Sequence, residues 1–299
     1  MSYTNTDRNL LLTINETVNG TTTTYTVDEL DNWSRTSGSA VSYGTMRISA
    51  STPMPFDILA AQFLYGAATD TRTDDDNYTF DSSPQTIHTI YDSDGIDTID
   101  ASNQSQSSTI NLGAGSFSSI GTRSVSEQLA ILDTKGLNSS DTVQTWLETA
   151  YDGASSTTSN DMDIDSLLYT GVDNVAIAYG VTIENAFGGS GDDIITGNAE
   201  NNYLKGNAGD DTLDGDTGNA DIAMFTGDKD DYTITTNAGL TTVTDTVNNR
   251  DGTDTLSNIE YLQFTESDAI AGFARMTATT LQNFTTDVTF DVNVDGNTN

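Results

Sequence analysis

A nine-residue repeat within residues 179–225 limits what this chain can fold into. Its pattern is Gly-Gly-x-Gly-x-Asp-x-aliphatic-x, and the best match is GGSGDDIIT at residues 188–196. A leading unit at 179–187 and three looser units up to residue 223 continue it. The acidic position of the five units is occupied, in order, by Glu184, Asp193, Asn202, Asp211 and Asp221, the last coming one residue late.

Each repeat combines a turn with a short strand. The glycine-rich half needs positive φ angles and close approach of the backbone, and the other half places one aliphatic residue inward. Those aliphatics are Ile195, Leu204 and Leu213. A flexible glycine and aspartate linker is the alternative, but it has no reason to keep an aliphatic at every ninth residue. The repeat therefore predicts a mainly β fold, a parallel β-roll.

Stacked half-coils of such a roll predict metal sites at both edges. Units two apart stack, so Asp193 meets Asp211 on one edge, while Asn202 lies between Glu184 and Asp221 on the other. Carboxylate and carbonyl oxygens in a flexible loop suit Ca²⁺, which takes six to eight oxygen ligands. The backbone positions expected to face these ions are Gly188, Ser190, Gly197, Ala199, Gly206, Ala208 and Gly218.

The overall charge supports a role for cations. Asp and Glu total 45 against 10 Lys and Arg, for a formal net charge of -35. This charge argues against nucleic acid or an anionic membrane as partner, and it predicts that divalent cations favour the compact state. The chain has no cysteine, no apolar run long enough to span a membrane, and no basic-then-apolar N-terminal leader.

The segments before the repeat have their own patterns. Residues 1–52 alternate polar and apolar side chains, which predicts short strands with a hairpin turn at Asn19-Gly20. From Pro55 the spacing of Phe56, Leu59, Ala60 and Phe63 predicts one helix that ends at Gly66. Further on, Asp92, Asp94 and Asp97 can converge on one ion. The alternative is a solvated acidic loop, but Ile96 and Ile99 favour a turn and strand.

Several segments in order resemble the C-terminal module of serralysin-type secreted metalloproteases. They are PFDILAAQFLYGA, TRTDDDNY, YDSDGIDTIDAS, INLGAGSFSSIG and AIAYGVTIENAFGGSGDDIITGN, within residues 53–225. The resemblance implies a calcium-filled parallel β-roll that follows a zinc protease domain. It also implies calcium ligands at Arg72, Asp74, Asp76, Asp92, Asp94, Gly95, Asp97, Thr182 and Glu184. At 74 and 94 this chain has Asp where the family has Gly.

The histidine content excludes the family's zinc chemistry from this chain. A zinc site of that kind needs three imidazoles, two of them in His-Glu-x-x-His, whereas His88 is the single histidine. We expect His88 to be a strand residue. We therefore expect no zinc and no enzyme activity.

Between about residues 121 and 171 the chain departs from the resemblance. Ser124 and Glu127 form a capping box, and Val143, Trp146, Leu147 and Ala150 mark a second apolar helical face. Residues 124–151 therefore read as a helical hairpin. It could pack on the roll, or it could bind a second copy or another extracellular protein.

The remaining residues, 226–299, read as a strand-rich cap followed by an acidic tail. The resemblance implies export by a type I system through an uncleaved C-terminal signal, to the cell surface or beyond. We predict a secreted, non-catalytic calcium-binding protein with a structural role, as a surface-layer, filament or matrix subunit. The alternatives are an accessory or relic module of a serralysin-like protease, acting as carrier, inhibitor or partner, and, less well supported, another hydrolase on a calcium scaffold.

Overall fold

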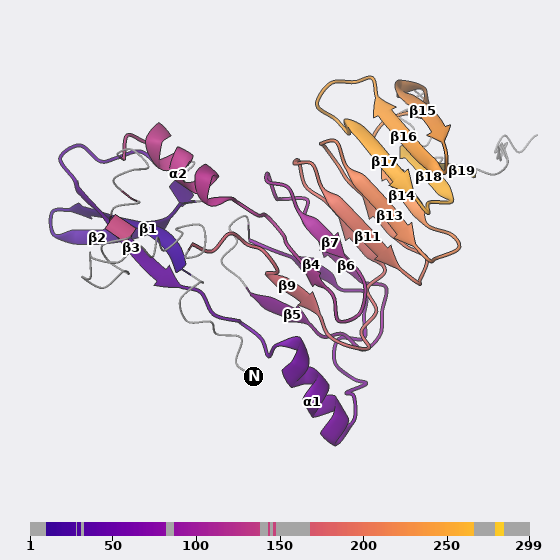
Figure 1. The fold of residues 1–299 in the computed structure, drawn as a ribbon, viewed down its shortest axis with the longest axis horizontal. Helices are drawn as coiled ribbons and strands as arrows, with labels where there is room; N and C mark the ends of the chain where they lie inside the picture. The colour runs from indigo at the N-terminus through magenta and orange to yellow at the C-terminus, as the bar shows by residue number, and fades with distance from the viewer. Residues whose placement is uncertain are drawn as a thin grey trace, which may run out of the picture.

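The computed structural model describes residues 10–27, 29–30, 33–81, 87–137, 143, 146–147, 168–265 and 279–283. It is mainly β, and most strands belong to a roll of two facing sheets that occupies one side of the molecule (Figure 1). A separate three-stranded sheet and helix α2 lie on the other side, and helix α1 stands below the roll in this view. The predicted fold class is confirmed.

One sheet of the roll has seven strands. Six of them are parallel and follow the sequence order β4 (Asn77–Thr79), β6 (Thr98–Asp100), β10 (Asn185–Phe187), β12 (Tyr203–Lys205), β14 (Ile222–Phe225) and β18 (Tyr261–Thr265). Strand β19 (Thr279–Asn283) joins β18 antiparallel.

The facing sheet has six strands. Its parallel strands are β7 (Thr109–Asn111), β11 (Ile194–Asn198), β13 (Thr212–Asp216) and β17 (Thr253–Ser257). The antiparallel strands β15 (Tyr232–Asn237) and β16 (Leu240–Asp245) extend it. A small third sheet is formed by β5 (His88–Ile90), β8 (Phe117–Ser118) and β9 (Val175–Ile177).

The register of both sheets follows the repeat. Ile195 pairs with Leu213, and Ala186 pairs with Leu204, each two repeat lengths later. These residues are fully buried and stack into one hydrophobic core between the sheets. Other buried residues of the same core include Tyr78, Ile99, Ile110, Ala223, Leu256 and Leu262.

The roll continues beyond residue 225. Strands β17 and β18 pair in parallel with β13 and β14, so they are further coils of the same roll. The β15–β16 hairpin is an excursion between β14 and β17. The segment expected to cap the roll therefore adds both an antiparallel hairpin and two further parallel strands to it.

The N-terminal strands form a sheet of their own, in the order β2-β1-β3. Strands β1 (Leu10–Val18) and β2 (Thr21–Thr26) are joined at Asn19-Gly20, where both residues have positive φ, so the predicted hairpin is confirmed. Strand β3 (Ala40–Arg47) pairs with the other edge of β1.

Helix α2 (Val125–Thr134) packs on this N-terminal sheet, not on the roll. The predicted capping box is present, because the Ser124 side chain accepts from the Glu127 N–H and Glu127 accepts from the Ser124 N–H. Val125 and Leu132 share a core with Leu12 and Ile14 of β1. Val143 and Leu147 of the insertion join the same core, whereas Ala150 lies outside the described residues. The alternative in which the hairpin packs on the roll is wrong, because the apolar residues of β1 cover it instead.

Helix α1 (Pro55–Tyr65) begins with a proline in its first turn and ends at Gly66, whose φ is 85°. The predicted helix is confirmed, but Pro55 is its one buried residue, and the face with Phe56, Leu59 and Phe63 is exposed. Among the described residues, neither α1 nor any other helix has the length and apolarity to cross a bilayer.

The stacked aliphatics give a stability prediction with an adjacent control. Ile195 is fully buried, whereas Ile194 beside it is 50% exposed. We expect Ile195→Ala to lower the free energy of unfolding by about 2–5 kcal/mol, because it leaves a cavity between the sheets. Ile194→Ala should cost less than about 0.5 kcal/mol. Urea denaturation in saturating calcium measures both, and a loss for Ile194→Ala as large as that for Ile195→Ala would contradict the inward placement of Ile195 alone.

Candidate metal centre

The turns at one edge of the roll are joined by backbone N–H groups that donate to carboxylates of the next coil. The N–H of Asp76 donates to Asp97 Oδ1 at 2.8 Å, and the N–H of Asp97 donates to Glu184 Oε2 at 2.7 Å. Asn202 follows in the next turn, with its side-chain amide on the Glu184 carbonyl oxygen at 2.8 Å. Its N–H donates to Asp221 Oδ1 at 2.7 Å.

The opposite edge repeats this arrangement. The N–H of Ser108 donates to Asp193 Oδ1 at 2.5 Å, and the N–H of Asp193 donates to Asp211 Oδ1 at 2.7 Å. The predicted pairing of Asp193 with Asp211 is therefore present, as is the stacking of Glu184, Asn202 and Asp221 on the other edge.

The glycines of each turn face the acidic side chain of the same turn. At Gly188, Gly197, Gly206 and Gly218, a β-carbon would collide with the carboxylate or amide oxygen that follows in the repeat. Successive turns also touch directly. Gly209 has a φ of +134°, and a β-carbon there would lie 2.5 Å from the carbonyl oxygen of Gly191. Any larger residue would push the coils apart.

The third residue of each turn, Ser190, Ala199 or Ala208, lies in the same loops. The N–H of Ser190 donates to the carbonyl of Gln104 at 3.0 Å, and the N–H of Ala208 donates to that of Gly189 at 3.3 Å. The turns thus stack through the backbone while their acidic side chains fill the edge.

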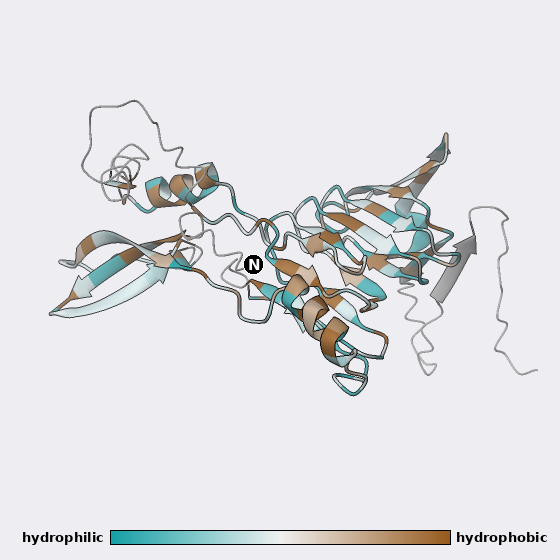
Figure 2. Cartoon of the chain, turned by 60° about the horizontal axis from the view of Figure 1, so that its bottom comes forward, coloured by the Kyte–Doolittle hydropathy of each residue, from teal (hydrophilic) through white to brown (hydrophobic). Residues whose placement is uncertain are grey.

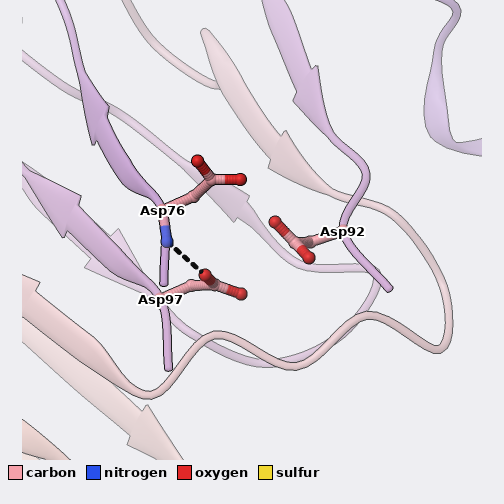
Figure 3. A group of neighbouring side chains, drawn as sticks. All are labelled: Asp76, Asp92 and Asp97. Carbon is pink, nitrogen blue, oxygen red and sulfur yellow. Dashed lines mark hydrogen bonds between the residues drawn. The ribbon is translucent and has the colours of Figure 1, made fainter. Parts of the chain in front are cut away.

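A compact carboxylate group lies at the first turns of the roll. Ligand oxygens of Asp76, Asp92 and Asp97 all lie within 4.8 Å of one another, and Asp92 reaches toward the other two from a neighbouring segment (Figure 3). Asp92 Oδ2 also accepts from the Tyr78 hydroxyl at 2.5 Å. The Arg72 guanidinium lies over the Tyr78 ring, 4.9 Å from its centroid.

The other residues implied by the resemblance surround this group. Asp74 and Asp94 are exposed and are not part of the carboxylate group, although the Asp74 carbonyl lies directly against Gly95. Gly95 adopts a φ of +128° there. Thr182 and Glu184 line a polar hollow of about 260 Å³ together with Asp92, Asp94, Gly95 and Glu200. Glu200 is an additional acidic group that the repeat pattern did not single out.

Burial raises the pKa of the carboxylates at both edges of the roll. Loss of hydration, followed by repulsion from neighbouring carboxylates, raises the pKa of Asp211 to about 7. Burial likewise raises the pKa of Asp97, Asp193 and Asp221 to about 6. The Oδ2 atoms of Asp211 and Asp221 are buried without a hydrogen-bond partner. An oxygen in this position fits a bound cation, which would stabilise the charged form.

At each edge, the acidic side chains that accept N–H groups from the preceding coil form a row, which we call a carboxylate ladder. The structure adds one acidic residue to each of the two ladders. The N–H of Asp211 donates to Asp254 Oδ1 at 2.9 Å, and the N–H of Asp221 donates to Glu260 Oε2 at 2.9 Å. Asp254 is 2% exposed, and burial raises its pKa to about 9. The sequence carries a signal for both, because each stands two residues before a buried leucine, Leu256 or Leu262, as Asp211 stands before Leu213.

The single histidine, His88, lies at the start of strand β5, as predicted for a strand residue. Its Nδ1 is 3.3 Å from the Ser51 hydroxyl, and burial lowers the pKa of the imidazole. It is therefore neutral at pH 7 and lies outside the carboxylate ladders.

Comparison with known proteins places the chain beside one family. The family described as "Peptidase M10 serralysin C terminal" matches residues 56–136 and 157–299. A serralysin from Proteus mirabilis is 34% identical over 165 residues, which cover 51% of this chain and 24% of that protein. Serralysin C from Dickeya chrysanthemi is 36% identical over 155 residues, covering 48% and 22%. The chain thus spans about a quarter of the length of these relatives.

Among solved structures, the extracellular lipase LipA from Serratia marcescens is similar over 38% of this chain and 20% of that chain. The TM-score is 0.19 and the sequence identity 18%, which is too distant to carry an argument about this chain.

The raised pKa values predict how pH affects the metal-free roll. The folded state keeps protons on Asp193, Asp211 and Asp254 at pH values where the unfolded chain has released them. Their contribution to stability is therefore full below about pH 4 and is lost as pH rises through about 6 to 9. We expect the melting temperature in chelator, followed by circular dichroism, to fall over this range.

Asp254→Asn serves as the control for this prediction, since it removes the group that titrates highest. The variant should fall less steeply than the wild type and should lose the part of the fall above about pH 7. A pH profile identical to that of the wild type would contradict the assignment.

Proposed function

This chain belongs to the peptidase M10 serralysin C-terminal family, and from that premise we propose that it is a secreted, non-catalytic calcium-binding protein that folds on extracellular calcium. The family binds calcium in its C-terminal β-roll. The buried carboxylates at both edges of the roll support the proposal in this chain. The strongest support comes from the Oδ2 atoms of Asp211 and Asp221, which are buried without a hydrogen-bond partner.

The proposed ligands fall into three groups. The first group lies at the first turns of the roll and consists of Asp76, Asp92 and Asp97, with Thr182 and Glu184 beside them. Along one edge Asp193 and Asp211 alternate with glycine-rich loops, and along the other Asn202 precedes Asp221. Bound calcium would supply the positive charge and the coordination that these buried oxygens lack.

The residues of the chain couple folding to cation binding. Each carboxylate accepts an N–H from the preceding coil. An aspartate held in its ionised form therefore also keeps its own coil in register with the preceding one. Without a cation the same groups must be protonated or repel one another. Extracellular calcium modules bind with dissociation constants of roughly 10⁻⁴ to 10⁻³ M. At about a hundred times that constant, each site would stabilise the fold by roughly 2.7 kcal/mol.

We further propose a structural role, as a surface-layer, filament or matrix subunit exported by a type I system. The acidic composition, absence of cysteine and single histidine support a scaffold over a catalyst. The second candidate is an accessory module of a serralysin-like protease. It is favoured by one observation, that the matching relatives are named serralysins and are about four times longer than the part they share with this chain.

The ligand assignment predicts the loss of calcium-dependent folding in one double variant. Asp193→Ala with Asp211→Ala should abolish the gain of β signal in circular dichroism on calcium addition, because both stacked carboxylates of one edge disappear. The control is Asp192→Ala with Asp210→Ala, which removes the same charge from the exposed neighbours. A normal calcium response in the first variant would refute the ligand assignment.

The structural role predicts calcium-dependent assembly. Electron microscopy of the purified chain, first in chelator and then in millimolar calcium, should show ordered sheets or filaments with calcium alone. Light scattering follows the same transition in solution. Folded monomers in calcium would contradict a subunit role and favour the accessory module.

A further inference from the structure

Helix α1 lies against the roll but leaves most of its large apolar side chains in solvent. Phe63, Leu64 and Tyr65 are 87%, 68% and 87% exposed, and Phe56 and Leu59 are 47% and 39% exposed. Figure 2 shows hydrophobic bands along helix α1, which stands out from the roll. Contiguous exposed apolar surface in a soluble protein marks a site of interaction.

The helix is nevertheless held firmly in place. The Gln62 side chain donates to the Tyr179 carbonyl at 3.0 Å, and the Phe56 ring lies 5.8 Å from the Tyr179 ring. Ile58 packs against the core of the roll. A binding partner would therefore meet a preformed surface and would not have to order the helix first.

Two hollows flank α1. One, of about 560 Å³, is lined by Ile58, Ala61 and Tyr65 of the helix and by Tyr91 opposite. The other, of about 500 Å³, is lined by Leu59 and by residues on the roll side that include Tyr179 and Val181. The helix is thus a ridge between two spaces that can receive side chains of a partner.

The second hollow leads into an acidic one. It shares Asp92, Ser93 and Gly180 with the polar hollow of about 260 Å³, which also holds Asp94, Glu184 and Glu200. Even with one divalent cation in that hollow, four carboxylates leave it negatively charged.

The first hollow adds little opposing charge. Asp57 and Arg72 both line it, and the Arg72 guanidinium already lies over the Tyr78 ring. His88 also lines it, and burial lowers its pKa, so the ring is neutral at pH 7. The surface around α1 is therefore apolar in its centre and acidic at one rim.

The insertion predicted as a partner site is less suited to that role. The apolar residues Val125, Leu132, Val143 and Leu147 are buried against the N-terminal sheet. Among the described residues, five exposed large apolar side chains lie together on α1.

We propose that α1 and its two flanking hollows form a docking site for a basic amphipathic helix of a partner protein. Apolar side chains of the partner cover Phe63 and Leu64 and enter the hollows, and its lysine or arginine side chains face the acidic rim. A second copy of this chain is disfavoured at this acidic rim, because it carries 45 acidic residues and offers only 10 lysine and arginine side chains to face it.

Two synthetic helical peptides test this proposal, one with a leucine face and a lysine face and one with glutamate in place of lysine. Fluorescence anisotropy at a fixed millimolar calcium concentration measures their binding to the full chain. The lysine peptide should bind, its affinity should fall as salt is added, and the glutamate peptide should bind about tenfold more weakly or not at all.

Paired variants separate this site from general attraction to an acidic protein. Phe63→Ser with Leu64→Ser should weaken binding of the lysine peptide roughly tenfold or more. Leu240→Ser with Val247→Ser removes two exposed apolar residues elsewhere, 50% and 43% exposed, and should leave the affinity unchanged. Equal affinities for both variants and the wild type would overturn the proposal.

Sedimentation velocity decides between occupants. A dimer that forms with increasing concentration and is lost in the Phe63→Ser, Leu64→Ser variant would identify a second copy and overturn the proposal. Calcium titration by circular dichroism accompanies each variant. Since the α1 substitutions leave every proposed calcium ligand in place, a failure of docking is distinguishable from a failure of calcium binding.

Discussion

The burial of acidic side chains between coils is the constraint on which the roll depends. An aspartate two residues before each inward aliphatic cannot avoid the edge of the roll once that aliphatic enters the core. There it accepts an N–H from the neighbouring coil, as Asp193 does from Ser108 and Asp211 from Asp193. The same contact that sets the register therefore places negative charge where water is scarce, and the pKa of Asp211 rises to about 7 in response. Core packing and the burial of carboxylates suited to a cation are thus two consequences of one short sequence pattern.

The ends of the roll show how this constraint is relieved without further repeats. At one end the Tyr78 hydroxyl donates to Asp92, and Arg72 lies over the Tyr78 ring. At the other, the Tyr232 hydroxyl donates to Asp251 at 2.5 Å, and Arg250 lies 5.0 Å from the centre of the Tyr232 ring. Two of the few arginines in the chain thus stand where the ladders stop, each above a tyrosine bonded to a buried aspartate. The guanidinium groups of Arg72 and Arg250 thus place a positive charge near the buried aspartate at each end of the roll.

The molecule separates its acidic and apolar surfaces. The roll concentrates carboxylates at its edges, the N-terminal sheet and α2 enclose a core of their own, and α1 stands out as a ridge with little charge. The proposed cation sites lie on the roll and the proposed docking site lies on the ridge. The two use different side chains, although Asp92 lines both the carboxylate group and the hollow beside α1.

The nine-residue period is enough to predict the roll between residues 188 and 223, since it fixes which side chains point inward and which coils stack. The sequence by itself also determined the Asn19-Gly20 turn and the capping box at Ser124, because both are local. The spacing of Asp254 and Glu260 from Leu256 and Leu262 is visible in the sequence, but their place in the ladders follows only from the fold. The β15–β16 hairpin interrupts the period before them, and no local rule states that β17 returns to β13. The packing of α2 on β1 and the exposure of α1 were likewise undetermined, because an apolar helical face specifies that it needs cover but not which element provides it.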